Sequence, residues 1–190
     1  MATDSLKTYL AQHFPSSPEE LERVVAAFTP KTVQKNEYLL SQNAICRYSY
    51  FIVKGALRAF FLNDDGQEAT RYIALENQFM SSIYSFISQT PTNEFIQATE
   101  TTDVLYISFS DFKAIVVETK LARDLYIKQL EVAYLTNHWR LESFLKMNAK
   151  QRYDFLMANH PTIIQRLSNK MVASYLGITQ ESLSRLKARS

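Results

Sequence analysis

The stretch from Lys120 to Lys146 contains neither glycine nor proline, and it constrains the fold more than any other feature of the sequence. Helix breakers are absent throughout, so the stretch predicts one long, unbroken helix. A helix of this length exceeds what the core of a small domain can cover. We therefore expect it to contact more than one body, and the rest of the chain has to be arranged around it.

The apolar residues of this stretch form two seams, whose members are mostly three, four or seven residues apart. One seam holds Leu121, Leu125, Val132, Leu135 and Trp139, and the other holds Ile127, Leu130, Tyr134, Leu141 and Phe144. One can pack on its own domain while the other pairs with a second copy, as in a short coiled coil. The alternative is a single helix buried deeply in its own domain. We favour a homodimer, with residues 119–146 as the dimerisation helix.

Before this helix, residues 33–109 are rich in aromatic and β-branched side chains, which favour strands. The strands are predicted at Tyr48–Val53, Ala56–Leu62, Ala69–Ala74, Phe95–Thr99 and Val104–Ser108. A tight hairpin turn is predicted at 63–66, where Gly66 tolerates a positive φ. Many short strands at this spacing predict an antiparallel β-roll, similar to a jelly roll.

Helices are predicted on both sides of the roll. Asp4 or Ser5 can cap a helix over Leu6–Phe14, and Ser17 followed by Pro18 can begin another that ends near Phe28. Ser110 and Asp111 precede a helix at Phe112–Glu118. We expect residues 1–118 to form one domain, the β-roll with its flanking helices.

Beyond Met147 the strand-type composition disappears, and short helical segments follow one another to the end of the chain. Residues 147–190 contain seven Lys or Arg against two Asp or Glu, a net charge of +5, whereas the whole chain carries only +2. This asymmetry suggests a polyanionic partner for the last segment. The predicted fold is therefore α+β: a β-roll domain, a long helix, and an all-α C-terminal domain.

The C-terminal domain contains the pattern of a helix-turn-helix. Ser168 can cap a first helix, Ala173 is small where two helices cross, Gly177 allows a sharp turn, and Thr179 can cap a second helix. An ordinary helical hairpin would also explain these residues. It would not explain the basic charge or the side chains described next.

Four side chains of the second helix are expected on its outer face and match the hydrogen-bonding pattern of the DNA major groove. They are Gln180, Glu181, Ser184 and Arg185. Hydroxyl and basic groups around the two helices suit contacts to phosphates. We predict phosphate contacts from Ser168, Lys170, Thr179, Ser182 and Arg189.

The combination of these segments resembles the Crp/Fnr family of bacterial transcription regulators. The resemblance is carried by residues 173–185, by residues 50–58 and 104–108 of the predicted roll, and by the hairpin at 64–68. It implies an effector-binding β-roll, a dimerisation helix and a helix-turn-helix that reads an inverted-repeat operator. In the family, the positions of Gln180, Glu181 and Arg185 contact bases. RNA polymerase is a further partner that the resemblance suggests.

The sequence departs from the family where its cyclic-nucleotide-binding members hold their ligand. Those members use a glycine–glutamate pair and a later arginine followed by Ser or Thr, whereas this chain has Ser81-Ser82 and Thr92-Asn93. No Lys or Arg lies between Arg71 and Lys113, and we expect Arg58 and Arg71 to face solvent. The roll is thus not expected to bind cyclic AMP. An uncharged pocket is predicted at Ser81, Ser82, Tyr84, Thr92 and Asn93; its effector, if one exists, is unknown.

Other functional classes are poorly supported. A β-roll metalloenzyme needs converging histidines, yet none lies between Phe14 and Asn137, and no nucleophile elbow or glycine-rich phosphate loop is present. The single Cys46 cannot form an internal disulfide or a thiolate metal site; haem ligation by one histidine is left open. We predict no enzyme activity, metal or cofactor.

Without a signal peptide or apolar span, a cytoplasmic protein is expected. The alternative function is a protein-interaction module with a vestigial sensor.

Overall fold

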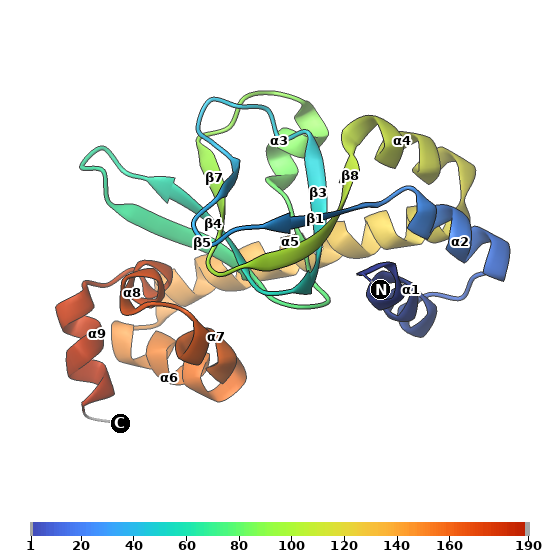
Figure 1. Ribbon diagram of the computed structural model, residues 1–190. Coiled ribbons are helices and arrows are strands. Elements are labelled where there is room, and N and C mark those ends of the chain that lie inside the picture. The colour runs from blue at the N-terminus through green and yellow to red at the C-terminus, as the bar shows by residue number, and fades with distance from the viewer. Residues whose placement is uncertain (1, 189–190) are drawn as a thin grey trace.

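The computed structural model describes residues 2–188, and its helices and strands alternate in the order shown in Figure 1. The strands are β1 (Thr29–Val33), β2 (Tyr38–Leu40), β3 (Tyr48–Lys54), β4 (Leu57–Leu62), β5 (Glu68–Ala74), β6 (Phe79–Met80), β7 (Glu94–Ala98) and β8 (Thr102–Ser108). The helices are α1 (Ala2–His13), α2 (Pro18–Ala26), α3 (Ile83–Ser88), α4 (Phe109–Glu118), α5 (Lys120–Lys146), α6 (Ala149–Asn159), α7 (Pro161–Arg166), α8 (Asn169–Leu176) and α9 (Gln180–Lys187). The predicted α+β fold is confirmed.

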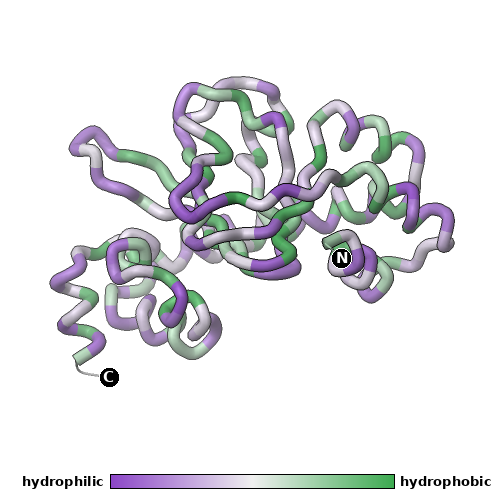
Figure 2. Tube along the Cα trace, in the orientation of Figure 1, coloured by the Kyte–Doolittle hydropathy of each residue, from purple (hydrophilic) through white to green (hydrophobic). Residues whose placement is uncertain are grey.

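The strands form two antiparallel four-stranded sheets, in the orders β1-β8-β3-β6 and β2-β7-β4-β5. The two sheets and helix α1 share a hydrophobic core that includes Phe51, Ile52, Leu57, Ile96 and Leu105, all fully buried or nearly so. Phe51 and Ile52 are adjacent in β3 and point to opposite faces, and the Phe51 ring contacts Tyr9 of α1. Figure 2 shows hydrophobic residues in the strands and along the helices, with hydrophilic residues at the tip of the β4–β5 hairpin. The β-roll thus forms because alternate strand residues share one apolar interior.

Local signals determined most element ends. Ser17 accepts a hydrogen bond from the amide of Glu20 and caps α2, and the amide of Gly66 donates to the carbonyl of Asn63 at 2.9 Å in the β4–β5 turn. Three expectations were inaccurate: α1 begins at Ala2, α4 is capped by Ser108, and the short elements β1, β2, β6 and α3 were not predicted.

Helix α5 has the predicted bounds and begins at the cap Thr119, whose hydroxyl accepts from the amide of Ala122. Its first turns pack on α4 and α2, and Leu121 and Leu125 are buried in the core that these helices share with the roll. Farther along, Ile127, Tyr134 and Leu141 stay exposed. Figure 1 shows α5 running from α4 to the C-terminal helices, so it connects the two ends of the molecule.

Helices α6 to α9 have a core of their own, built from Tyr153, Leu156, Val172, Leu176 and Leu183. Ile73 of strand β5 is part of the same core. The C-terminal unit therefore packs directly on the roll. Among the described residues, no helix is both long enough and apolar enough to cross a membrane.

Candidate nucleic-acid interface and roll cavity

Helices α8 and α9 form the predicted helix-turn-helix. Ser168 caps α8 by accepting from the amide of Met171 at 3.3 Å, and Thr179 caps α9 by accepting from the amide of Ser182 at 3.2 Å. Between them, Gly177 has φ +65°, a left-handed conformation that glycine adopts without strain. The buried Ala173 and Leu183 face inward. The local sequence therefore determines both the turn and the face that α9 presents.

The outer face of α9 carries the side chains predicted to read bases: Gln180, Glu181, Ser184 and Arg185 are all exposed. The Arg185 guanidinium donates to the Ser182 hydroxyl at 3.2 Å through Nη2. The pKa of Glu181 is lowered, first by a hydrogen bond from the Thr179 hydroxyl and also by the charge of Arg185. The face is therefore polar, charged and unobstructed, as direct readout of a groove requires.

The residues predicted to contact phosphates differ in their surroundings. The hydroxyls of Ser168 and Thr179 cap helices α8 and α9. Both residues are exposed, so the N-terminal ends of these two helices lie at the surface. Lys170 forms an ion pair with Glu68 of strand β5, with 2.7 Å between Nζ and Oε1. Arg189 lies outside the described residues. The pairing of Lys170 was not predicted, because Glu68 is remote in sequence.

A hydrogen-bonded contact joins the C-terminal unit to strand β5 of the roll. The Thr70 amide donates to the Ser174 hydroxyl at 2.9 Å, and the two hydroxyls lie 2.6 Å apart. Arg140 of α5 donates to the carbonyls of both Thr70 and Tyr175, and its guanidinium stacks over the Tyr175 ring at 4.3 Å. Strand β5, helix α5 and helix α8 are therefore tied together at one point.

Ion pairs strengthen the same contact. Arg166 of α7 pairs with Glu76 at 2.7 Å and also with Glu100, and Lys170 pairs with Glu68, which in turn binds Arg58. The Arg166 guanidinium lowers the pKa of Glu76 to about 2, and the two carboxylates raise the pKa of Arg166. Two of the basic residues in the +5 segment are thus neutralised by acids of the roll.

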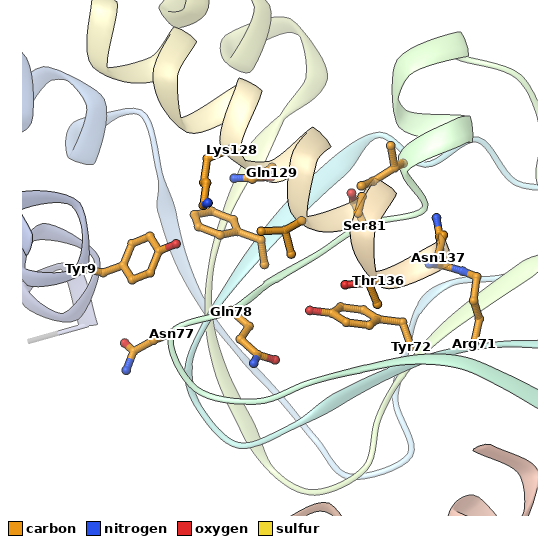
Figure 3. Close-up of a pocket in the computed structure, with 14 residues that line it drawn as sticks. Tyr9, Arg71, Tyr72, Asn77, Gln78, Ser81, Lys128, Gln129, Thr136 and Asn137 are labelled. Atoms are coloured by element: carbon orange, nitrogen blue, oxygen red, sulfur yellow. The ribbon is translucent and has the colours of Figure 1, made fainter. Parts of the chain in front are cut away.

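A cavity of about 280 Å³ lies between the roll and helix α5 (Figure 3). Its lining comes from α1, β5, the segment around β6, the first residue of α3 and one face of α5. The residues are Tyr9, Arg71, Tyr72, Asn77, Gln78, Phe79, Ser81, Ile83, Lys128, Gln129, Val132, Ala133, Thr136 and Asn137.

The predicted effector pocket is not formed as expected. Of its five residues only Ser81 lines this cavity. Ser82 is buried, with its hydroxyl 3.3 Å from that of Thr92, whereas Tyr84 is 75% exposed and Asn93 is also exposed. The short helix α3, which was not predicted, separates these positions and turns Tyr84 outward.

The expectation that two strand arginines face solvent was also wrong. Arg58 is 3% exposed and donates to Gln97 and Glu68, and Arg71 donates through Nε to Glu94, a carboxylate buried in the roll. Burial of a charge requires such a partner. For Arg58 on β4 the acid lies on the neighbouring strand β5, whereas for Arg71 on β5 it lies on β7, beyond β4. Either pair could have been indicated only once the order and register of the strands were known.

Comparisons with known proteins agree with this architecture. Residues 30–119 match the family model described as "Cyclic nucleotide-binding domain". No curated protein sequence matches the chain.

Several solved structures are similar over most of their length. FixK2 from Bradyrhizobium japonicum is 18% identical, with a TM-score of 0.73 over 85% of this chain and 83% of that one. The c-di-GMP-responsive global regulator CLP of Xanthomonas campestris is 16% identical, with a TM-score of 0.71 over 91% of both chains. A protein described as a Crp/Fnr family transcriptional regulator, from Eubacterium rectale, is 19% identical, with a TM-score of 0.70 over 92% and 85%. The resemblance seen in the sequence is thereby confirmed: residues 30–119 match the model of the cyclic nucleotide-binding domain, and the chain has the fold of the Crp/Fnr transcription regulators.

Proposed function

We propose that this protein is a DNA-binding transcription regulator that acts as a homodimer on an inverted-repeat operator. The observation that carries the proposal is the outer face of α9, where Gln180, Glu181, Ser184 and Arg185 are exposed together on a properly capped helix-turn-helix. Arginine pairs with guanine and glutamine with adenine in the major groove. The similar solved structures include transcription regulators, which supports a regulatory rather than an enzymatic role.

The dimer is supported by the exposed part of α5. Ile127, Tyr134 and Leu141 lie seven residues apart and are 55%, 70% and 61% exposed, so they form an exposed apolar stripe on one helix face. Two such stripes can pair as a short coiled coil. Dimerisation would place the two α9 helices about 34 Å apart, one turn of DNA, and an inverted repeat follows from the twofold symmetry.

We also propose that cyclic AMP does not bind the roll. The positions corresponding to the charged ligands of the family hold Ser82 and Thr92 or Asn93, and the hydroxyls of Ser82 and Thr92 face each other. Arg71, on a nearby strand, is paired with the buried carboxylate of Glu94, two residues after Thr92, which reduces its capacity to neutralise a cyclic phosphate. Isothermal titration calorimetry should detect no binding of cyclic AMP or cyclic GMP; a micromolar Kd for either would contradict this assignment.

Selection of DNA from a random-sequence pool, followed by gel-shift measurement, tests the main proposal. The selected sequences should share an inverted repeat with half-sites about one helical turn apart. The double variant Gln180→Ala/Arg185→Ala should lose this preference while keeping its fold by circular dichroism. No enrichment from the pool, together with capture of a protein partner, would favour the interaction module instead.

A further inference from the structure

Two polar residues lie in the otherwise apolar exposed face of α5. Beside the exposed apolar stripe of this helix runs a second row of exposed residues, again spaced by seven: Glu131, His138 and Leu145. The two rows alternate every three or four residues, which is the spacing of a coiled-coil seam. Leu145 suits such a seam because it is apolar, but Glu131 and His138 do not. A polar group at a seam position costs stability unless it gains a partner.

The imidazole of His138 has no hydrogen-bond partner among residues 2–188. Its ring stacks on that of Tyr134, with 6.1 Å between the ring centroids and 17° between the ring planes. By contrast, Nδ1 of His13 lies 2.8 Å from the carbonyl oxygen of Tyr9. Both nitrogens of His138 are therefore available to a group outside this chain, and a neutral imidazole is a common ligand of transition metals.

A carboxylate lies one helical turn beyond His138. Glu142 follows it by four residues, so both side chains project from the same side of α5. The pKa of Glu142 is lowered first by a hydrogen bond from Lys146 and also by the charge of His138, which indicates that the two groups are close. The Lys146 side chain is 72% exposed, so a stronger partner can displace it from Glu142. One α5 helix thus offers a nitrogen donor and an oxygen donor side by side.

A single chain does not complete a metal site from these donors. Nowhere in residues 2–188 do three or more His, Cys, Asp or Glu side chains come together in a way that could hold a metal ion. In a parallel pair of α5 helices, the twofold axis places each seam residue next to the same residue of the second copy. His138 then meets its equivalent, and a Glu142 flanks each ring. Two imidazoles and two carboxylates are four ligands, of the number and types that Zn²⁺ takes in tetrahedral sites.

We propose that two copies of this chain together bind one Zn²⁺ ion at the axis of the α5 pair, through His138 and Glu142 of each copy. The site rests on the homodimer proposed above, because each copy supplies half of the ligands. Ligation gives a partner to a histidine that the seam would otherwise leave unpaired. Glu131 lies seven residues before His138, about 10 Å along the helix, and is too far away to bind the same ion.

Isothermal titration calorimetry with ZnCl₂ tests the site on the full chain, freed of metal beforehand with EDTA. Zn²⁺ binding should saturate at one ion per two chains. Co²⁺, which is coloured and accepts the same ligands, should give the visible absorption of a four-coordinate ion. No saturable binding of Zn²⁺, or saturation at one ion per chain, would overturn the proposal.

Variants identify the ligands. His138→Ala and Glu142→Gln should each weaken Zn²⁺ binding by at least about tenfold, because loss of a ligand costs no less than loss of a group that orients one. The matched controls are His160→Ala, at another exposed histidine, and Glu131→Gln, at another α5 carboxylate that pairs with a lysine. Both controls should bind Zn²⁺ like the wild type. Circular dichroism checks that each variant is folded; unchanged Zn²⁺ binding by folded His138→Ala would refute the site.

Analytical ultracentrifugation distinguishes failure of the metal site from failure of the dimer. Zn²⁺ should lower the dimer dissociation constant of the wild type by at least about tenfold and leave that of His138→Ala unchanged, because only the dimer carries the complete site. A wild-type dimer that is equally tight in Zn²⁺ and in EDTA would refute the metal site and retain the homodimer. A protein that stays monomeric with Zn²⁺ and with DNA would refute both. A Zn²⁺-stabilised dimer that selects no DNA would retain the site and refute the regulator.

Discussion

Arg185 is the residue on which the proposed DNA readout depends most directly. Its guanidinium is exposed on α9 and contacts Ser182, while Glu181 influences it only through charge. A bidentate contact to guanine is worth about 1–3 kcal/mol of discrimination. Arg185→Ala should therefore reduce the ratio of operator to scrambled-DNA affinity in competition gel-shifts. Lys170→Ala, which removes a proposed phosphate contact, should weaken both DNAs alike. An unchanged ratio in Arg185→Ala would remove the base-reading role.

Gly177 is the residue that the helix-turn-helix geometry most needs. With φ +65°, an added Cβ would lie 2.5 Å from the Phe144 ring, so Gly177→Ala combines backbone strain with a steric clash. The strain alone costs about 1–2 kcal/mol. Gly66→Ala is the control, because Gly66 has φ +74° and open space around it. Thermal unfolding should show a larger loss for Gly177→Ala, part of which Phe144→Ala restores; equal losses would show that the ring accommodates the methyl group.

At the scale of elements, the docking of α7 and α8 on strand β5 depends on protonation. Arg166 holds the pKa of Glu76 at about 2, below its ordinary value of 4.5. Because the folded-state pKa is the lower one, this ion pair stabilises the folded protein above about pH 4.5, and the contribution is lost as pH falls toward 2. The difference in unfolding temperature between wild type and Glu76→Gln should accordingly shrink over this range. A difference that stays constant would show that Glu76 contributes no charge-dependent stability.

The proposed dimer belongs to the scale of the whole molecule, because Tyr134 and Leu141 of α5 are 70% and 61% exposed in one chain. Placing a charge there should prevent close pairing of two helices. Tyr134→Glu/Leu141→Glu should sediment as a monomer in analytical ultracentrifugation and bind the operator far more weakly. Val117→Glu is the control, since Val117 is equally apolar and 76% exposed but lies on α4. A wild-type protein that is monomeric with and without DNA would refute the dimer.

Much of this molecule follows from local sequence signals. The bounds of α5, the caps Ser168 and Thr179, the turn at Gly177 and the exposed face of α9 were all predicted, because each depends on residues close together in the chain. The same holds for the main strands of the roll, where aromatic and β-branched runs favour extended structure. Local periodicity and capping chemistry are sufficient for features of this kind.

Only the tertiary structure decided where the charges of the roll lie. Arg58 is buried and Arg71 is half-buried, because the pairing of the strands brings Gln97 and Glu68 beside Arg58 and Glu94 beside Arg71, and no local pattern shows that register. The cavity beneath α5 likewise combines α1, β5 and α5, which are far apart in the sequence. Burial and ion pairing depend on which distant segments meet, and that is set by packing of the whole chain rather than by the residues of any one segment.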